Sequence, residues 1–238
     1  TSLSPSLTAT ISLPERRILP DDSVVELKEG AQIDIDFSGS LRRVTLRQGE
    51  AHFQVVKNTR PFVVEAAGVK VRAVGTAFSV QLGLKQVEVL VSEGQVQLAP
   101  LPGATSVATG SDLETALPAA DLAGSVVGQP IMGAGYRAII SLDKAAPQIG
   151  AVSDAELADR LSWRIPSLEF SRTPLTEVVA LMNRHAAGRQ KVRFVVASPE
   201  LREVKLSGFL RTDNSEGLVR LLENNFGVKA ERSGDTIT

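Results

Sequence analysis

Few residues of this chain can carry out acid–base, nucleophilic or metal chemistry. The 238-residue sequence contains no cysteine and only two histidines, His52 and His185. Without cysteine, disulfides, thiolate zinc sites and cysteine nucleophiles are excluded. Because the two histidines are far apart in the sequence, a histidine metal site or a proton relay is hard to assemble. The sequence therefore predicts no catalytic, metal-binding or cofactor-binding residue and a protein that is not an enzyme.

The remaining titratable candidates fit ordinary structural roles. Strand alternation places His52 on the face opposite Phe53, and so predicts that His52 faces solvent. His185 falls at the edge of a helical apolar stripe, where we expect a half-buried side chain. Asp34 and Asp36 share one strand face and are predicted to cover a solvated surface rather than to act as paired catalytic acids.

Two other motifs also have a simple structural interpretation. Residues 133–138, Gly-Ala-Gly-Tyr-Arg-Ala, loosely fit a dinucleotide-binding pattern, but the β-like run that follows predicts a glycine turn leading into a strand. The arginine doublets Arg16-Arg17 and Arg42-Arg43 are predicted to serve solubility and cross-strand pairing.

Composition places the chain in the ordinary globular range, with 43% hydrophobic and 22% charged residues. The net charge of −1 gives no field to hold a polyanion, which argues against a nucleic-acid partner. The charge varies along the chain. Residues 1–100 are neutral, residues 101–162 are acidic and residues 163–238 are mildly basic. We predict three parts with these boundaries, the middle one a linker or long loop with room for an extra strand at 136–142.

The first part is predicted to be all-β. Period-two alternation recurs through residues 1–100 and is interrupted by turn residues at near-regular spacing, which leaves no room for a helix. A sandwich, a barrel and a short β-solenoid all remain compatible with this pattern.

The last part, residues 163–238, is predicted to be an α+β module of order β-α-β-β-α-β-β. A first helix is expected to begin with Thr173 as N-cap and Pro174 at its first position, and to end near Gly188. The second is expected to begin at Asp213, with Glu216 at the capping-box position, and to stop at Gly227. Trp163 is expected to pack this module against the rest of the chain.

A series of motifs resembles the FecR family, the transmembrane anti-sigma regulators of cell-surface signalling in Gram-negative bacteria. The first is the stretch 19–27, Leu-Pro-Asp-Asp-Ser-Val-Val-Glu-Leu, and others follow in the family's order: residues 44–51, 60–64, 74–78 and 93–94. Further matches at 163–164, 168–170, 174–175 and 182–185 are similar to the family's C-terminal portion, itself similar to the short N-terminal domain of secretins and TonB-dependent receptors. The sequence departs from the family at Asp22 and Pro166, where glycine is usual, and at His185, where tyrosine is usual.

The resemblance implies a periplasmic sensor region of a single-pass inner-membrane protein, with its membrane span and cytoplasmic anti-sigma segment before Thr1. It implies that the sensor binds the N-terminal signalling domain of an outer-membrane TonB-dependent siderophore transporter. The signal would then pass across the membrane to an extracytoplasmic-function sigma factor, which the cytoplasmic segment contacts.

Sheet edges are the expected contact points, because an unpaired edge can accept a strand from another protein. The strand pattern favours two runs as partner-binding strands: Val192, Arg193 and Phe194, and Val204, Lys205, Leu206 and Ser207. Self-association through the same edges is also open. A different class of function, a cell-envelope module that binds glycan or peptidoglycan, is disfavoured by an aromatic content of 4%.

Overall fold

The computed structural model describes residues 8–99, 130–143, 146–185 and 192–238. The chain forms two compact units. One contains Glu15–Arg160 and is called the β unit below. The other, called the α+β unit, combines Thr1–Pro14 with Leu161–Thr238. Segments from the two ends of the chain therefore share one unit.

The β unit consists of strands that alternate inward apolar and outward polar residues. Its elements are β2 (Glu15–Ile18), β3 (Val24–Leu27), β4 (Gln32–Asp36), β5 (Arg42–Gln54), β6 (Phe62–Ala66), β7 (Val69–Ala73), β8 (Ala77–Leu82), β9 (Gln86–Glu93), β10 (Gln95–Ala99), β11 (Ile131–Gly133), β12 (Tyr136–Ser141), β13 (Gln148–Ala151) and the helix α1 (Asp154–Arg160). Except for β5–β6, all strand pairs of this unit are antiparallel.

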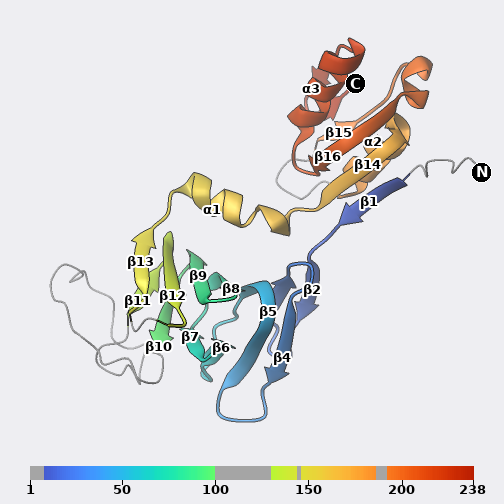
Figure 1. The fold of residues 1–238 in the computed structure, drawn as a ribbon. Helices are drawn as coiled ribbons and strands as arrows, with labels where there is room; N and C mark the ends of the chain where they lie inside the picture. The colour runs from blue at the N-terminus through green and yellow to red at the C-terminus, as the bar shows by residue number, and fades with distance from the viewer. Residues whose placement is uncertain (1–7, 100–129, 144–145, 186–191) are drawn as a thin grey trace, which may run out of the picture. The chain divides into compact units, whose positions relative to one another are not determined.

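The long strand β5 joins two groups of strands in this curled sheet (Figure 1). Its first half pairs with β4 and β6, and its second half pairs with β3 and β8. Gly49 stands at the change, with φ of +81° and a position where a Cβ atom would lie 2.8 Å from the Cα of Ala31. Only glycine fits this approach, because any side chain would both clash and strain the backbone.

Both groups of strands contribute to one core. Its aromatic centre is formed by Phe53, Phe62 and Phe78, with ring centroids 6.0 Å apart for Phe53–Phe62 and 5.4 Å for Phe53–Phe78. Valine and leucine side chains from the flanking strands complete the core, as the inward positions of the alternation predict.

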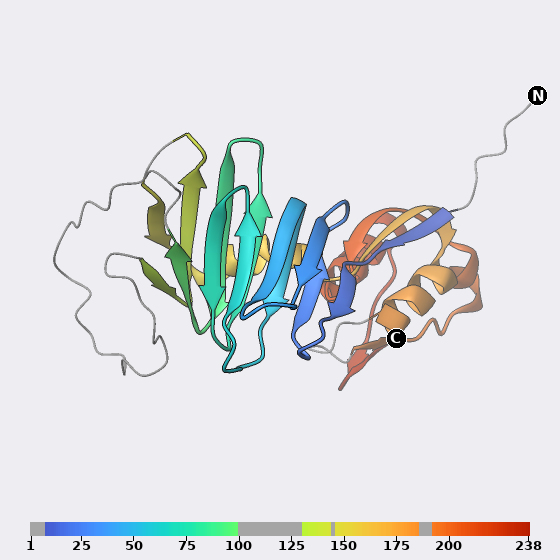
Figure 2. The same ribbon diagram turned by 90° about the horizontal axis from the view of Figure 1, so that it is seen from below.

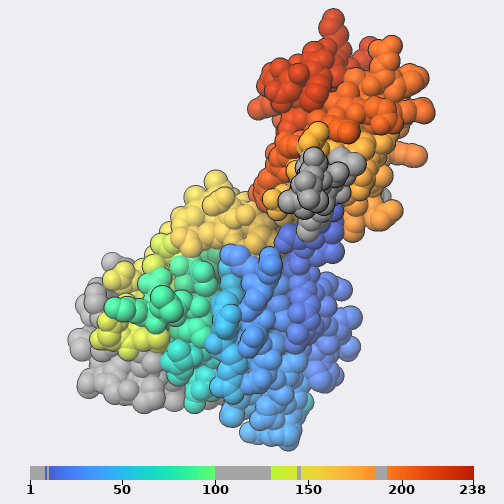
Figure 3. All heavy atoms as spheres, turned by 45° about the vertical axis from the view of Figure 1, so that its right-hand side comes forward, coloured from blue at the N-terminus to red at the C-terminus, as the bar shows by residue number. Residues whose placement is uncertain are grey.

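Residues 131–160, expected within the linker region, extend the β unit, and the extra strand predicted at 136–142 is present as β12. β11 pairs with β10, and β12 pairs with β9 over Tyr136–Ser141. The expected loop at 101–129 lies outside the described residues. The helix α1 has no buried residue. It is held by ion pairs: Arg160 binds Glu88 of β9, and Glu156 binds Arg137 of β12 at 3.2 Å. Figures 2 and 3 show α1 against these strands.

The α+β unit contains β1 (Thr8–Ser12), η1 (Ser162–Arg164), β14 (Ser167–Pro174), α2 (Leu175–His185), β15 (Arg193–Phe194), η2 (Pro199–Glu203), β16 (Lys205–Arg211), α3 (Ser215–Phe226), β17 (Arg232–Ser233) and β18 (Thr236–Ile237). The sequence expectation of an all-β part followed by an α+β module is thus confirmed at this coarse level. The strands, however, divide between two sheets of order β1-β14-β16 and β15-β18-β17. The N-terminal strand β1 was not expected in this module.

The helix starts differ from the predicted ones. Thr173 and Pro174 end β14, so α2 begins at Leu175. In α3 the N-cap is Asn214, whose side chain accepts a hydrogen bond from the Gly217 N–H at 2.9 Å. Asp213, the predicted cap, instead forms an ion pair with Arg211 at 3.0 Å. Gly227 ends α3 with φ of +64°, as predicted. The predicted end of the first helix near Gly188 lies outside the described residues.

Candidate protein-interaction site

In the first predicted contact run, residues 192–194, a side chain occupies the strand edge at one residue. Val192 and Phe194 are buried, and Arg193 is exposed. Phe194 pairs with Ile237 of β18 on one side. On the other side the Asn183 side chain donates to the Phe194 C=O at 2.9 Å and accepts from its N–H at 2.8 Å. The Asn183 amide thus occupies the place that a neighbouring strand would take at Phe194.

The second predicted run, residues 204–207, lies at a more accessible edge. Val204 is half-buried and precedes β16, which includes exposed Lys205 and Ser207 and buried Leu206. β16 is the end strand of its sheet and pairs with β14. Among the described residues, no strand pairs with its other edge. The structure therefore places three of the predicted residues, Lys205, Leu206 and Ser207, in a strand with an open edge, and their role in binding stays a prediction.

Phe209 is the residue of β16 that the sequence reasoning missed. Its side chain is 66% exposed although it lies in the middle of a strand. The neighbouring Leu210 is buried in the core. Two adjacent large apolar residues on a strand point to opposite faces, so the Phe209-Leu210 pair was the available signal.

The backbone of Phe209 also faces the open edge. The Thr212 N–H donates to the Pro166 C=O at 2.8 Å, on the β14 side. In an antiparallel pair, successive residues direct their N–H and C=O groups alternately toward the partner strand and away from it. Arg211 and Phe209 therefore direct these groups away from β14. Phe209 offers an exposed ring together with backbone groups at the open edge.

Charged and polar side chains flank Phe209 on the same face of β16. Alternation places Lys205, Ser207 and Arg211 with it, while Leu206 and Leu210 face the core. The register sets Phe209 opposite exposed Glu169 of β14. We refer to Lys205, Ser207, Phe209 and Arg211 as the β16 face. An apolar centre with a polar surround is the usual composition of a protein-binding patch.

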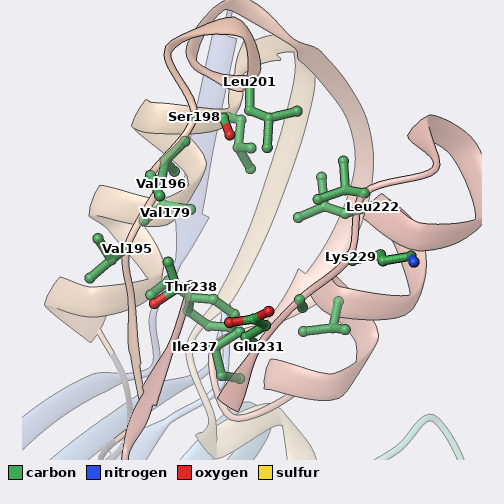
Figure 4. Close-up of a pocket in the computed structure, with 16 residues that line it drawn as sticks. Val179, Val195, Val196, Ser198, Leu201, Leu222, Lys229, Glu231, Ile237 and Thr238 are labelled. Atoms are coloured by element: carbon green, nitrogen blue, oxygen red, sulfur yellow. The ribbon is translucent and has the colours of Figure 1, made fainter. Parts of the chain in front are cut away.

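A second feature of this unit is an apolar cavity of about 210 Å³ between α2 and α3. Val179 of α2 and Leu222 of α3 line opposite sides, and Ile237 of β18 lies below them (Figure 4). Leu201 of η2 closes another side. The cavity has the apolar lining expected of a site for a hydrophobic side chain.

The β unit contains a buried ion pair with a structural role. Arg42, expected to serve solubility, is fully buried because it shares the inward face of β5 with Val44 and Leu46. Its guanidinium forms an ion pair with Asp21, donates to the Arg60 C=O at 2.9 Å and to the Val56 C=O at 3.0 Å. The Arg42 guanidinium also lies 5.3 Å from the centre of the Phe62 ring. Strand alternation from Val44 would have identified this position.

The Asp21 carboxylate is the acidic partner in this network. Ser23 donates to it twice, from its hydroxyl at 2.7 Å and from its N–H at 3.1 Å. Burial by itself raises the pKa of Asp21, but the hydrogen bonds from Ser23 and Arg42 outweigh burial and the pKa is lowered. The Asp-Asp-Ser segment at 21–23 therefore joins the start of the β unit to β5.

His52 is buried, contrary to the prediction, with 1% of its surface exposed. Its face of the sheet also carries buried Glu50, Ser79 and Leu90, together with Glu88, where α1 is attached. This second face is therefore covered as well, and the Nδ1 atom of His52 lies 3.0 Å from the Ser79 hydroxyl. His185 is half-buried and Asp34 and Asp36 are exposed, in agreement with their predicted placement.

Over residues 8–99, 130–143, 146–185 and 192–238, histidine and carboxylate side chains nowhere form a group able to hold a metal ion. None of the helices in the described part of the chain has the length and hydropathy of a membrane span.

Comparison with known proteins identifies the β unit. The family model described as FecR protein matches residues 15–97. Two crystal structures, each of a candidate anti-sigma factor from Parabacteroides distasonis ATCC 8503, are similar to this chain at 18% identity and a TM-score of 0.48. The alignments cover 97% and 98% of this chain and 97% of each of the two crystallised chains. No curated protein sequence matches the chain significantly.

The match begins at Glu15, where the β unit begins, and ends within β10. It includes the Asp21–Ser23 segment, Arg42 and the bend at Gly49, which hold the β unit together. The predicted resemblance to the FecR family is confirmed over residues 15–97, which are called the FecR domain below.

Proposed function

We propose that this chain is the periplasmic signal-receiving part of an anti-sigma regulator. The match of residues 15–97 to the FecR family carries the proposal, because that family consists of membrane-anchored, non-enzymatic regulators of sigma-dependent signalling. The sigma factor would be contacted by a cytoplasmic segment before Thr1. The role of the present chain is then to bind the incoming partner and relay its arrival.

The partner in this proposal is the N-terminal signalling domain of an outer-membrane TonB-dependent siderophore transporter. That domain class is expected to share the fold of the α+β unit, so it offers strands of its own. The β16 face supports binding of this kind, because a strand can be added to the open edge while Phe209 inserts between the partner's side chains. The Asn183 clamp makes β15 the less suitable edge.

A proline scan combined with calorimetry tests this proposal. Each variant carries one proline, in the run 192–194 or in the run 204–207, and is titrated with the signalling domain of the transporter encoded beside this gene. We expect wild-type binding in the micromolar range or tighter, and weakening of at least about tenfold for prolines in 204–207. Prolines in 192–194 are expected to weaken binding less, provided that circular dichroism shows them folded.

Two results would contradict parts of the proposal. Absence of heat and of any co-migrating complex with the wild-type chain would remove the transporter domain as the partner. Unchanged affinity for every variant in 204–207 would leave the partner in place but move the contact away from β16.

A further inference from the structure

The N-terminal strand β1 is the third strand of a sheet whose other two strands, β14 and β16, come from the C-terminal part of the chain. Thr8–Ser12 pairs antiparallel with Ser167–Ser171 of β14, and β1 is an end strand of the sheet β1-β14-β16 (Figure 1). The next strand along the chain, β2, belongs to the FecR domain and not to this unit. β1 therefore pairs with a strand far from it in sequence and belongs to a different unit from β2, the strand that follows it. We call β1 the N-terminal arm.

The packing of β1 is weak compared with that of the strands beside it. Ala9 and Ile11 face the core, and both are only partly buried. By contrast, Leu168 and Phe170 of β14 and Leu206 and Leu210 of β16 are buried. Since apolar burial is the main stabilising term, β1 is the strand of this sheet that separates most easily.

The connection after β1 favours an extended arm. Only Leu13 and Pro14 separate β1 from β2, and Leu13 is exposed. A residue before proline is restricted to extended conformations, so Leu13 cannot readily fold into a helical turn. A detached β1 would therefore remain extended, which is the conformation needed to pair with the edge of β14.

We propose that β1 is exchanged between two copies of this chain, so that each α+β unit is completed by the β1 strand of the other copy. The edge of β14 selects this occupant, because a second copy supplies the same register and the same Ala9 and Ile11 contacts. Exchanging an identical element is a low-cost route to a symmetric dimer. In such a dimer, the α+β unit of one copy pairs with the N-terminal strand of the other copy. The proposal does not depend on the identity of the signalling partner.

An engineered disulfide can detect the exchange, because the chain has no cysteine of its own. The register places Ser12 opposite Ser167, and Thr10 opposite Glu169. Since Leu210 and Leu168 direct their backbone groups toward each other, Ser167 and Glu169 direct theirs toward β1. Hydrogen-bonded antiparallel pairs have Cα atoms about 5.5 Å apart, which lies within the disulfide range. The conservative double variant Ser12→Cys/Ser167→Cys therefore reports which chain supplies β1.

The experiment mixes unlabelled and ¹⁵N-labelled chains of this double variant, lets them equilibrate and oxidises them. Exchange predicts linked peptides 12–167 of mixed isotope composition. It also predicts a covalent dimer fraction that rises at least about fivefold when the protein concentration is raised about a hundredfold before oxidation. The single variants Ser12→Cys and Ser167→Cys control for random collision. Only unmixed 12–167 peptides at every concentration would overturn the proposal.

Proline variants provide an independent reading by sedimentation. Thr10→Pro removes the N–H that faces β14, whereas Ala9→Pro removes one that faces away from it. The proposal expects Thr10→Pro to shift the chain to monomer and Ala9→Pro to retain most of the dimer. A wild-type chain that sediments as a monomer up to the highest soluble concentration would also overturn it.

Discussion

The buried pair Asp21–Arg42 is the residue-scale feature on which the FecR domain depends. Both side chains are almost fully inaccessible, and each has further partners besides the other. A buried charge is tolerable only when it is paired and hydrogen-bonded, because desolvation otherwise costs several kcal/mol. The pair therefore fixes one arrangement of the strands that meet at β5.

Truncation of Arg42 is expected to be severely destabilising. Arg42→Ala leaves the Asp21 carboxylate buried without its counter-charge, and we expect the free energy of unfolding to fall by about 3–5 kcal/mol. Arg43, its exposed neighbour on the same strand, is the matched control, and Arg43→Ala should change stability by less than about 0.5 kcal/mol. Urea unfolding followed by circular dichroism measures both. Equal effects would show that the buried pair does not stabilise the domain.

The lowered pKa of Asp21 makes stability depend on pH in a defined direction. At acid pH the Asp21 carboxyl binds a proton more readily in the unfolded chain than in the folded one. The free energy of unfolding therefore decreases as the pH is lowered. The contribution is present above the ordinary Asp pKa of 3.8 and is lost as the pH falls from there through the lower folded value. Asp21→Asn should flatten this part of the pH–stability curve. A curve for Asp21→Asn that parallels the wild type below pH 4 would contradict the assignment.

At the scale of elements, the two predicted contact edges of the α+β unit, at β15 and at β16, differ in what lies beside them. The Asn183 side chain occupies the β15 edge at Phe194, while the β16 edge beyond Phe209 has no strand beside it among the described residues. A side-chain amide that pairs with a strand edge blocks unwanted strand addition there. This difference supports the proposal that a partner binds at β16.

The Asn183 clamp can be removed without touching the core. Asn183→Ala deprives the Phe194 N–H and C=O of their partners, and we expect a loss of about 1–2 kcal/mol together with faster hydrogen exchange at Phe194. Arg184→Ala, on the neighbouring exposed position of α2, is the control. An unchanged exchange rate at Phe194 in Asn183→Ala would argue that the amide does not protect this edge.

Element prediction from the sequence succeeded where a local pattern decides the outcome. Alternation gave the strands of the FecR domain, and Gly227 gave the end of α3. It failed where distant parts of the chain decide. His52 is buried because the second sheet face is covered, and β1 joins β14 through a pairing across more than 150 residues. Of the candidate site, the strand pattern predicted Lys205 and Ser207, and the adjacent Phe209 and Leu210 would have indicated an exposed Phe209. The Asn183 clamp depends on a contact between α2 and β15 that no local pattern encodes.

At the scale of the whole molecule, the β unit and the α+β unit have separate cores and separate features. The β unit carries a buried ion pair and a helix attached by ion pairs, which are structural features. The α+β unit carries the open β16 edge, an exposed aromatic residue and an apolar cavity, which are features of binding surfaces. These features support the proposal that the α+β unit recognises the partner.

The most direct test of this account is a calorimetric titration of the transporter signalling domain into the wild-type chain and Phe209→Ala. Phe226→Ala, which truncates another exposed phenylalanine of the same unit, is the control. A central aromatic anchor contributes about 2 kcal/mol or more, so Phe209→Ala should weaken binding at least about thirtyfold while Phe226→Ala stays close to wild type. Equal affinities for all three chains would contradict the assignment of recognition to the β16 face.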